Sequence, residues 1–161
     1  MSQPFSIREA VGADYERLCA LFAEVDALHA ERAPWLFRTP LSEPRSREFV
    51  AAQAHGADST LLVADAGELV GVATVLMRSA PEFGVFVPQR WGVLDGIAVT
   101  QACRRRGVGT ALTRAAEAWA HARSAQWLEL VVYDFNADAR GFYEALGYLP
   151  TSTKLRKPLR E

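Results

Sequence analysis

The sequence predicts one α/β domain, residues 1–161, built around a mixed sheet. Two observations carry this prediction. Runs rich in β-branched and aromatic residues alternate along the chain with segments whose apolar residues recur at helical spacing. The 161 residues, half of them apolar and about a quarter charged, also fit a single globular hydrophobic core.

The first third of the chain predicts one strand and two helices. Phe5–Glu9 has the composition of a short strand, and Asp14 can cap the next helix by accepting N–H bonds of its first turn. Three prolines within 31–44 indicate a loop, and a second helix is expected around Arg45–Ala54. The first helix is expected from the spacing of its apolar residues, Leu18, Leu21, Phe22, Val25 and Leu28.

The middle of the chain predicts a hairpin followed by a third strand. The runs STLLVAD and LVGVATVLM flank a short turn that contains Gly67, an arrangement typical of a β-hairpin. The run WGVLDGIAV predicts the next strand. Gly96 inside it indicates a β-bulge or the close approach of a ligand.

The last third predicts two helices and two strands. The first helix carries an apolar stripe from Val108 to Trp119, and QWLELVVYD after it predicts a buried strand. The run NADARGFYEALG predicts another helix, with Asn136 as its N-cap and Gly147 at its C-terminal left-handed position. The tail YLPTSTKLRKPL is expected to add a strand at the sheet edge, where prolines are tolerated.

The composition excludes several classes of function. The formal net charge is −1 and the pI is near 6.3, so the broad basic field of a nucleic-acid-binding protein is absent. Cys19 and Cys103 share no metal or redox spacing, so we expect no metal site and two reduced thiols in a cytoplasmic protein. No apolar run is long enough to span a membrane, and the N-terminus lacks the pattern of a signal peptide.

The stretch TQACRRRGVGTALTRAAEAW, from Thr100 to Trp119, combines three arginines and two glycines between a strand and a helix. The first turn of a helix presents free N–H groups and partial positive charge, and arginine adds bidentate bonds to phosphate oxygens. Gly107 and Gly109 allow close backbone approach and unusual φ values. The spacing matches neither a P-loop nor a dinucleotide fingerprint. On these residues alone, a solvated basic turn remains an equal interpretation.

The stretch also resembles a known family. Arg104, Gly107 and Gly109 match the Q/R-x-x-G-x-G/A signature of the GNAT acyl-CoA N-acyltransferases, after the strand-like LDGIAVTQ. Asn136, Ala139 and the run FYEALGY resemble the family's second conserved block. The resemblance implies a GNAT-type fold, in which a central, mostly antiparallel mixed sheet is flanked by about four helices. It also implies transfer of an acetyl group from acetyl-CoA to a primary amine. The Ala- and Arg-rich residue usage of the chain separately indicates a bacterial gene.

The resemblance implies a site for acetyl-CoA. Its diphosphate is expected at the backbone amides and side chains of the loop, and its pantetheine arm along the preceding strand. Asn136 would face the cofactor, with Phe142 and Tyr143 near the thioester. The complete set of cofactor residues is Ile97, Ala98, Val99, Arg104, Arg105, Arg106, Gly107, Val108, Gly109, Thr110, Asn136, Phe142 and Tyr143.

Two residues are candidates for catalysis. Tyr143 is expected to act as a general acid toward the departing thiolate, because a phenol carries its proton at neutral pH. Asp95 is expected either to accept the proton of the attacking amine or to orient the substrate; strand alternation would put it on the face of Ile97 and Val99. Tyr133 and Asp134 are weaker alternatives for the base.

The sequence gives less information about the residues that bind the amine acceptor. The resemblance places it near the first two helices, and His29, Trp35, Phe37, Asp95 and Tyr133 are the candidate substrate residues. They suit a small-molecule or peptide amine with an apolar body. A non-catalytic acyl-CoA-binding sensor of the same fold is the alternative function. The family also leaves a homodimer open.

Overall fold

The computed structural model describes residues 4–40 and 45–159. The chain divides into two compact units, Met1–Val131 and Val132–Glu161, which are described separately below. Among the described residues, the first unit contains the sheet and three α-helices, and the second contains one α-helix. That all 161 residues form one domain stays a prediction.

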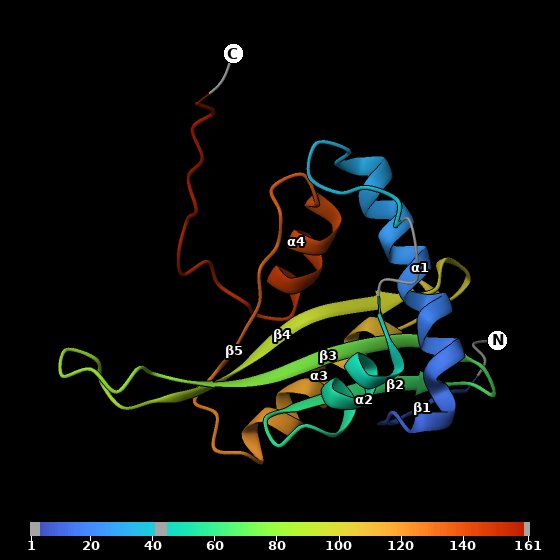
Figure 1. The fold of residues 1–161 in the computed structure, drawn as a ribbon, viewed down its shortest axis with the longest axis horizontal. Helices are drawn as coiled ribbons and strands as arrows, with labels where there is room; N and C mark the ends of the chain where they lie inside the picture. Colours follow the sequence, from blue (N-terminus) through green and yellow to red (C-terminus); the bar gives the residue numbers. More distant parts are fainter. Residues whose placement is uncertain (1–3, 41–44, 160–161) are drawn as a thin grey trace. The chain divides into compact units, whose positions relative to one another are not determined.

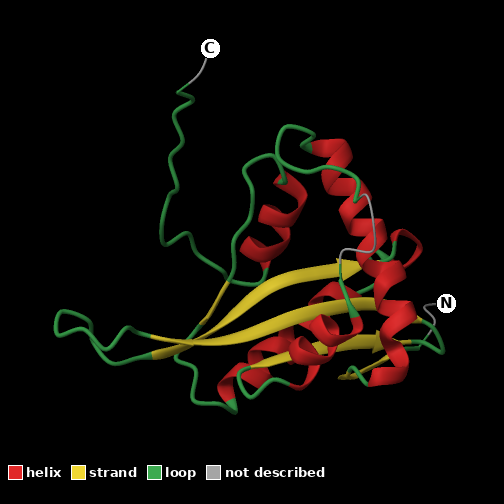
Figure 2. Ribbon diagram, in the orientation of Figure 1, coloured by secondary structure: helices red, strands yellow, loops and turns green. Residues whose placement is uncertain are grey.

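The first unit is built on a five-stranded sheet (Figures 1 and 2). Its strands follow chain order across the sheet: β1 (Ser6–Glu9), β2 (Ser59–Asp65), β3 (Leu69–Ser79), β4 (Arg90–Val99) and β5 (Leu128–Glu129). The helices of this unit are η1 (Gly12–Asp14), α1 (Tyr15–Arg32), α2 (Arg47–His55), η2 (Gln101–Cys103) and α3 (Val108–His121).

The pairing makes this a mixed, mostly antiparallel sheet. The strands β1 to β4 pair antiparallel with their neighbours, and β5 joins β4 in parallel through Gly92↔Leu128 and Val93↔Glu129. The predicted hairpin is present: Gly67, in the β2–β3 turn, has a φ of 91°, a left-handed value that suits glycine. With four α-helices in the described residues, the predicted fold class is confirmed.

Helices cover both faces of the sheet. On one face, Val72 of β3 joins a buried apolar cluster with Leu18 and Leu21 of α1 and residues of α2. The neighbouring Gly71 points the other way, because side chains alternate along a strand. A Cβ on Gly71 would lie 2.9 Å from Leu112 Cδ1, so α3 packs directly on the backbone of this opposite face.

The second unit holds α4 (Ala137–Ala145). The predicted cap is confirmed, since the Asn136 side chain accepts the N–H of Ala139 at 3.3 Å. The predicted end is confirmed as well, because Gly147 has a φ of 92°. Short-range cap and turn chemistry therefore sets both ends of this helix.

Two strand predictions are wrong. The run Gln126–Asp134 forms a strand only at Leu128–Glu129, and residues 149–159 of the tail have no regular secondary structure. Val131 is 87% exposed and Leu155 88% exposed. An apolar β-prone run becomes a strand only where a neighbouring strand supplies its hydrogen bonds, and no short-range pattern reports that neighbour.

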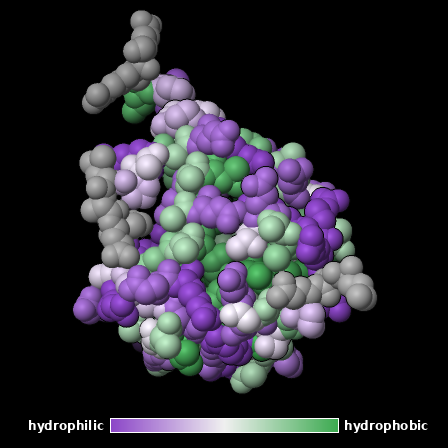
Figure 3. Space-filling view, turned by 90° about the vertical axis from the view of Figure 1, so that its right-hand side faces the viewer, coloured by the Kyte–Doolittle hydropathy of each residue, from purple (hydrophilic) through white to green (hydrophobic). Residues whose placement is uncertain are grey.

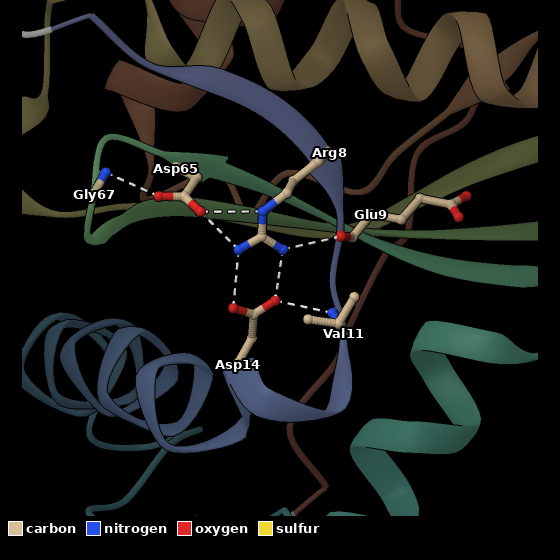
Figure 4. A network of polar contacts seen from close by, with 6 residues as sticks. All are labelled: Arg8, Glu9, Val11, Asp14, Asp65 and Gly67. Atoms are coloured by element: carbon tan, nitrogen blue, oxygen red, sulfur yellow. Dashed lines mark hydrogen bonds and ion pairs between the residues drawn. The ribbon is translucent and has the colours of Figure 1, made fainter.

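Asp14 precedes α1 as predicted, but its side chain does not cap the helix. Instead, its carboxylate receives two bonds from the Arg8 guanidinium, of 2.7 and 3.0 Å, and accepts the Val11 N–H at 2.9 Å (Figure 4). Arg8 also donates to Asp65 at 2.7 and 3.1 Å, and Asp65 accepts the Gly67 N–H at 2.9 Å. One arginine thus ties β1, the start of α1 and the β2–β3 turn together.

The described surface carries no membrane signal of the helical kind: none of the helices in residues 4–40 and 45–159 is long and apolar enough to cross a bilayer. On the face drawn in Figure 3, hydrophobic and hydrophilic residues are interspersed. Such a surface agrees with the half-apolar composition of the sequence.

The Arg8–Asp14 pair predicts an acid-sensitive stability. Replacing Asp14, whose side chain is 4% exposed, by Asn should lower the free energy of unfolding by about 1.5–3 kcal/mol, because a charged hydrogen-bond partner of Arg8 is lost. Urea unfolding at pH 7 measures this change. The control is Asp58→Asn, which removes an exposed pair with Arg90 and should cost about 0–1 kcal/mol.

The pH dependence has a definite sign. Hydrogen bonds from Arg8 lower the pKa of Asp14 in the folded protein. The resulting stability is present above the pKa of an unfolded aspartate, about 3.9, and is lost as the pH falls through the lower folded value. The stability of Asp14→Asn should therefore fall less steeply in this range, and an identical slope would contradict the role of the pair.

Candidate functional site

The strand β4 contains a one-residue bulge. Thr74 of β3 pairs with Gly96, whereas the next residue, Val75, pairs with Leu94, so Asp95 lies opposite no residue of β3. A Cβ on Gly96 would meet no atom within 4 Å, and both Asp95 and Gly96 are exposed. The bulge predicted from Gly96 is therefore confirmed, and it puts Asp95 at the irregular point of the strand.

The bulge inverts the side-chain alternation of β4. Gly92 faces Ala120 of α3, and Leu94 shares that face, whereas Ala98 belongs to the apolar cluster under α1 and α2. Simple alternation would have put Leu94 and Ala98 on one face. The spacing argument that placed Asp95 on the face of Ile97 and Val99 therefore does not hold across this position.

The outer edge of β4 is only partly paired. β5 pairs with Gly92 and Val93, and no strand in the described residues lies beside 94–99 on that edge. Ile97, Ala98 and Val99 lie on this stretch. An unpaired edge presents backbone N–H and C=O groups that an extended ligand can bind.

A tight loop joins β4 to α3. After η2, the chain turns through Arg104–Gly107, where Arg105 has a φ of 62° and Gly107 a φ of 83°. A Cβ on Gly107 would meet no atom within 4 Å. Gly109, also expected to allow unusual φ values, instead lies within α3 and has no left-handed φ.

The loop leaves a row of backbone N–H groups without partners. None of the six amides from Arg105 to Thr110 donates a hydrogen bond to the described residues, and α3's first bond runs from Ala111 N–H to Gly107 O at 2.9 Å. Val108 is 2% exposed and anchors the start of the helix in the core. The helix of 14 residues adds partial positive charge at this end. Free N–H groups and partial positive charge at one place are the features that favour an anion.

The three loop arginines differ in their surroundings. Arg105 and Arg106 are exposed and make no hydrogen bond or ion pair within the described part of the chain. Arg104 turns back: its Nε donates to Val99 O at 3.1 Å, and its Nη2 lies 3.5 Å from Glu24 Oε1. Two arginines are thus available to an anion, and one holds the protein's own backbone.

Sequence reasoning missed Glu24. Its Oε1 accepts the N–H of Gln101, the first residue of η2, at 2.8 Å. The two residues are 77 positions apart, and nothing in the spacing of α1 distinguishes Glu24 from its other surface acids. Only a contact between distant segments reveals it.

The second unit holds the aromatic candidates of α4. Tyr143 is 7% exposed, and its ring makes edge contacts with Phe142 at 5.0 Å and Tyr148 at 5.6 Å between ring centroids. Burial raises the pKa of Tyr143 to about 12. Its hydroxyl therefore keeps its proton throughout the physiological range.

The candidate acceptor residues are described within their own units. His29 near the end of α1 stacks on Phe37 with ring centroids 4.9 Å apart, while Trp35 between them in sequence is 70% exposed. In the second unit, Tyr133 is 42% exposed and stacks on Phe135 at 5.3 Å. The structure thus brings His29 and Phe37 together. In residues 4–40 and 45–159, no three His, Cys, Asp or Glu side chains gather as metal ligands.

Solved structures share this fold. The BH1408 protein from Bacillus halodurans, in a mutant form, is 25% identical with a TM-score of 0.88, over 96% of this chain and 99% of that chain. A putative acetyltransferase from Agrobacterium tumefaciens is 20% identical with a TM-score of 0.74, over 95% and 99%. The aminoglycoside N-acetyltransferase AAC(6')-Iy, in complex with CoA, is 19% identical with a TM-score of 0.69, over 96% and 99%.

The comparison with curated proteins found no match. The model of the acetyltransferase (GNAT) family matches residues 22–148, which include β4, the Arg-Gly loop, α3 and α4. The match spans well over half of the chain, and the solved structures agree with it in fold. The protein therefore belongs to the acetyltransferase (GNAT) family.

Proposed function

We propose that this protein transfers an acetyl group from acetyl-CoA to a primary amine. The observation that carries the proposal is the row of six unpaired amides, Arg105 to Thr110, at the start of α3 in a member of an acetyltransferase family. A diphosphate needs several hydrogen-bond donors aimed at one place, and this row supplies them. The CoA complex of a protein with the same fold supports the choice of cofactor.

The cofactor's two ends would meet different parts of the first unit. The amides of Arg105–Thr110 would hold the diphosphate, and Arg105 and Arg106 would add charge-assisted bonds. The pantetheine arm would extend along the unpaired edge of β4 at Ile97–Val99. Gly107 suits this arrangement because no side chain stands between its backbone and the anion. By family resemblance, we also assign Asn136 and Phe142 to the cofactor.

Acetyl-CoA supplies the acetyl group as a thioester. The amine nitrogen forms a bond to the carbonyl carbon, the carbon–sulfur bond breaks, the nitrogen loses one proton and the sulfur gains one. We assign to Tyr143, on family resemblance, the donation of a hydrogen bond to the departing sulfur. With a pKa of about 12, the hydroxyl is always protonated. Because this pKa lies above that of the coenzyme A thiol, taken as about 8.5 by analogy with cysteine, the hydroxyl stabilises the departing thiolate by a hydrogen bond and keeps its own proton. The sulfur then takes its proton from water.

The amine must reach the carbonyl group unprotonated. A lysine-like amine with a pKa of about 10.4 is neutral about once in 2,500 molecules at pH 7, a cost of roughly 4.6 kcal/mol. We propose Asp95 as the group that accepts this proton or orients the ammonium ion before water removes the proton. Its exposed position at the β4 bulge supports either role. His29, Trp35, Phe37 and Tyr133 are proposed to line the acceptor side, for a small-molecule or peptide amine.

We propose direct transfer between the two substrates. Cys103 is a free thiol, but it lies in η2, where its N–H bonds to Thr100 O at 2.9 Å, and no neighbouring base activates it in the described structure. Both free cysteines support a reducing, cytoplasmic location. The non-catalytic sensor is the competing function.

The diphosphate site predicts a charge-specific loss of binding. Gly107→Asp should weaken the binding of CoA by about 100-fold at low salt, because a carboxylate a few ångströms from a phosphate costs several kcal/mol at an effective dielectric constant near 20. Isothermal titration calorimetry with CoA measures this change. The loss should shrink as salt screens the repulsion.

The control for this variant is Gly107→Asn. Asparagine has almost the same size as aspartate and also tolerates a left-handed φ, so both variants share the steric change at a φ of 83°. Only the charge differs. Equal affinities of the two variants for CoA, with both folded, would mean that the phosphate lies elsewhere.

The proposed role of Tyr143 predicts a catalytic loss without a binding loss. Tyr143→Phe should lower kcat by about 100-fold, the lower end of the cost of losing one hydrogen-bond donor to a developing negative charge, and leave the Kd for CoA unchanged. Thiol release with a panel of primary amines measures turnover. Tyr148→Phe, which removes the hydroxyl of a ring packed on Tyr143, is the matched control and should retain kcat. Wild-type binding of CoA with no turnover on any amine would favour the sensor.

A further inference from the structure

A side chain of α1 forms a hydrogen bond with the segment that joins β4 to α3. Gln101 opens η2, and the first residues of a helical turn lack backbone acceptors for their N–H groups. Glu24, on the third turn of α1, fills this gap with its Oε1 at 2.8 Å from the Gln101 nitrogen. The bond joins a charged acceptor to a backbone donor, and such bonds are stronger than neutral ones.

Arg104 makes a second set of contacts at the other end of η2, and we call the contacts of Glu24 and Arg104 together the clasp. Its Nε donates to the carbonyl of Val99, the last residue of β4, at 3.1 Å, while its Nη2 approaches Glu24 Oε1 at 3.5 Å. The ion pair is 38–39% exposed on both sides and contributes little by itself. The two bonds to backbone groups are the main contacts. The Glu24 bond fixes the start of η2 to α1, and the Arg104 bond fixes the end of η2 to the last residue of β4.

We propose that Glu24 is a positioning residue for the coenzyme A loop, and that Arg104 belongs to this clasp instead of contacting the diphosphate. The inference rests on the proposed function, since it concerns the site of the same cofactor. It reassigns the first residue of the Arg-Gly motif from ligand to support. The direct contacts with phosphate then come from the amides of Arg105–Thr110 and from the two unpaired arginines.

The geometry of the loop explains why such support is needed. Arg105 adopts a φ of 62°, a left-handed value that is unfavourable for a residue other than glycine, so the turn is not the conformation this segment prefers alone. Its six amides from Arg105 to Thr110 donate no hydrogen bond to residues 4–40 or 45–159 that would hold the turn. The buried Val108 fixes the turn at its far side, and the clasp of Glu24 and Arg104 fixes it at the near side.

The negative charge of Glu24 and the positive charge of Arg104 also offset each other. A carboxylate near an anion site repels a diphosphate, and Glu24 avoids most of this cost because the Arg104 guanidinium neutralises it. Removing Arg104 therefore has two effects: the clasp loses its bond to Val99, and the charge of Glu24 faces the site unopposed. In a variant that lacks Glu24, removing Arg104 no longer exposes the site to an unopposed negative charge.

The first test compares Glu24→Ala with the wild-type protein. The Kd for CoA should rise about three- to tenfold, the change that loss of one ordinary hydrogen bond produces, because the bond between Glu24 and Gln101 is solvent-exposed. The variant should remain folded, with a Tm lowered by a few degrees at most. The amide of Gln101 should exchange its hydrogen at least about tenfold faster in the absence of CoA. Unchanged affinity would overturn the positioning role, and unchanged exchange would overturn the clasp itself.

The matched control is Glu16→Ala. Glu16 lies on the same helix, about 12 Å along its axis from Glu24, and also forms an exposed pair with an arginine, Arg47. Its removal should leave both the Kd for CoA and the exchange of the Gln101 amide unchanged. Equal effects of the two variants would mean that a general change in α1, not the clasp, alters binding.

The second test is a double-mutant cycle on the affinity for CoA. If Arg104 acts through the clasp, Arg104→Ala should weaken binding at least about threefold less in the Glu24→Ala background than in the wild-type protein. If Arg104 contacts the diphosphate directly, the substitution should cost the same factor in both backgrounds. The second result would overturn the reassignment of Arg104.

The experiments distinguish an error in the proposed function from an error in the positioning role of Glu24. If the wild-type protein bound no CoA, the function and the positioning role would both fall, yet the exchange of the Gln101 amide would still show whether Glu24 holds η2. If the wild-type protein bound CoA and Glu24→Ala bound it equally well, only the positioning role would fall. The two sets of results do not overlap.

Discussion

The close packing of α3 on the backbone of β3 and β4 is the constraint on which the candidate site depends. Gly71 and Gly92 leave no room for a Cβ, because Leu112 and Ala120 of α3 occupy that space. The helix is therefore fixed against the sheet along its length, and its first turn stands at the end of β4. A row of unpaired amides is useful only if it does not move, and this packing holds it.

The β4 bulge and the short β5 create the other half of the first unit's site. Asp95 leaves the ladder with β3, and β5 ends after two residues. Within the described part of the chain, the outer edge of β4 from position 94 onward therefore has no strand beside it. A regular, longer β5 would have covered that edge. The irregular strand thus leaves exposed backbone next to the anion site, where a cofactor with a phosphate end and an amide-containing arm can bind both features.

Turns and helix ends were predictable because neighbouring residues in the sequence determine them. Gly67, Gly107 and Gly147 all have the left-handed φ that their places in turns or at helix ends indicated, and Asn136 caps α4. Predictions failed where a distant partner decides the outcome. Asp14 lies where a cap belongs, but Arg8 takes its carboxylate. The apolar run after Trp127 pairs with a neighbouring strand only at Leu128–Glu129. The bulge in β4 interrupts the side-chain alternation that was assumed for Asp95. Glu24 reaches the loop across 77 residues, and no sequence pattern contained that contact.

Calorimetric titration of the purified protein with acetyl-CoA tests the central claim most directly. The account predicts saturable binding at micromolar concentration, with one molecule per chain and an affinity that falls as salt increases, because the phosphate contacts are electrostatic. Heats indistinguishable from dilution at low salt would contradict it. In that case, the six free amides at the start of α3 would be a solvated turn, and the proposed acetyl transfer would lose its cofactor site.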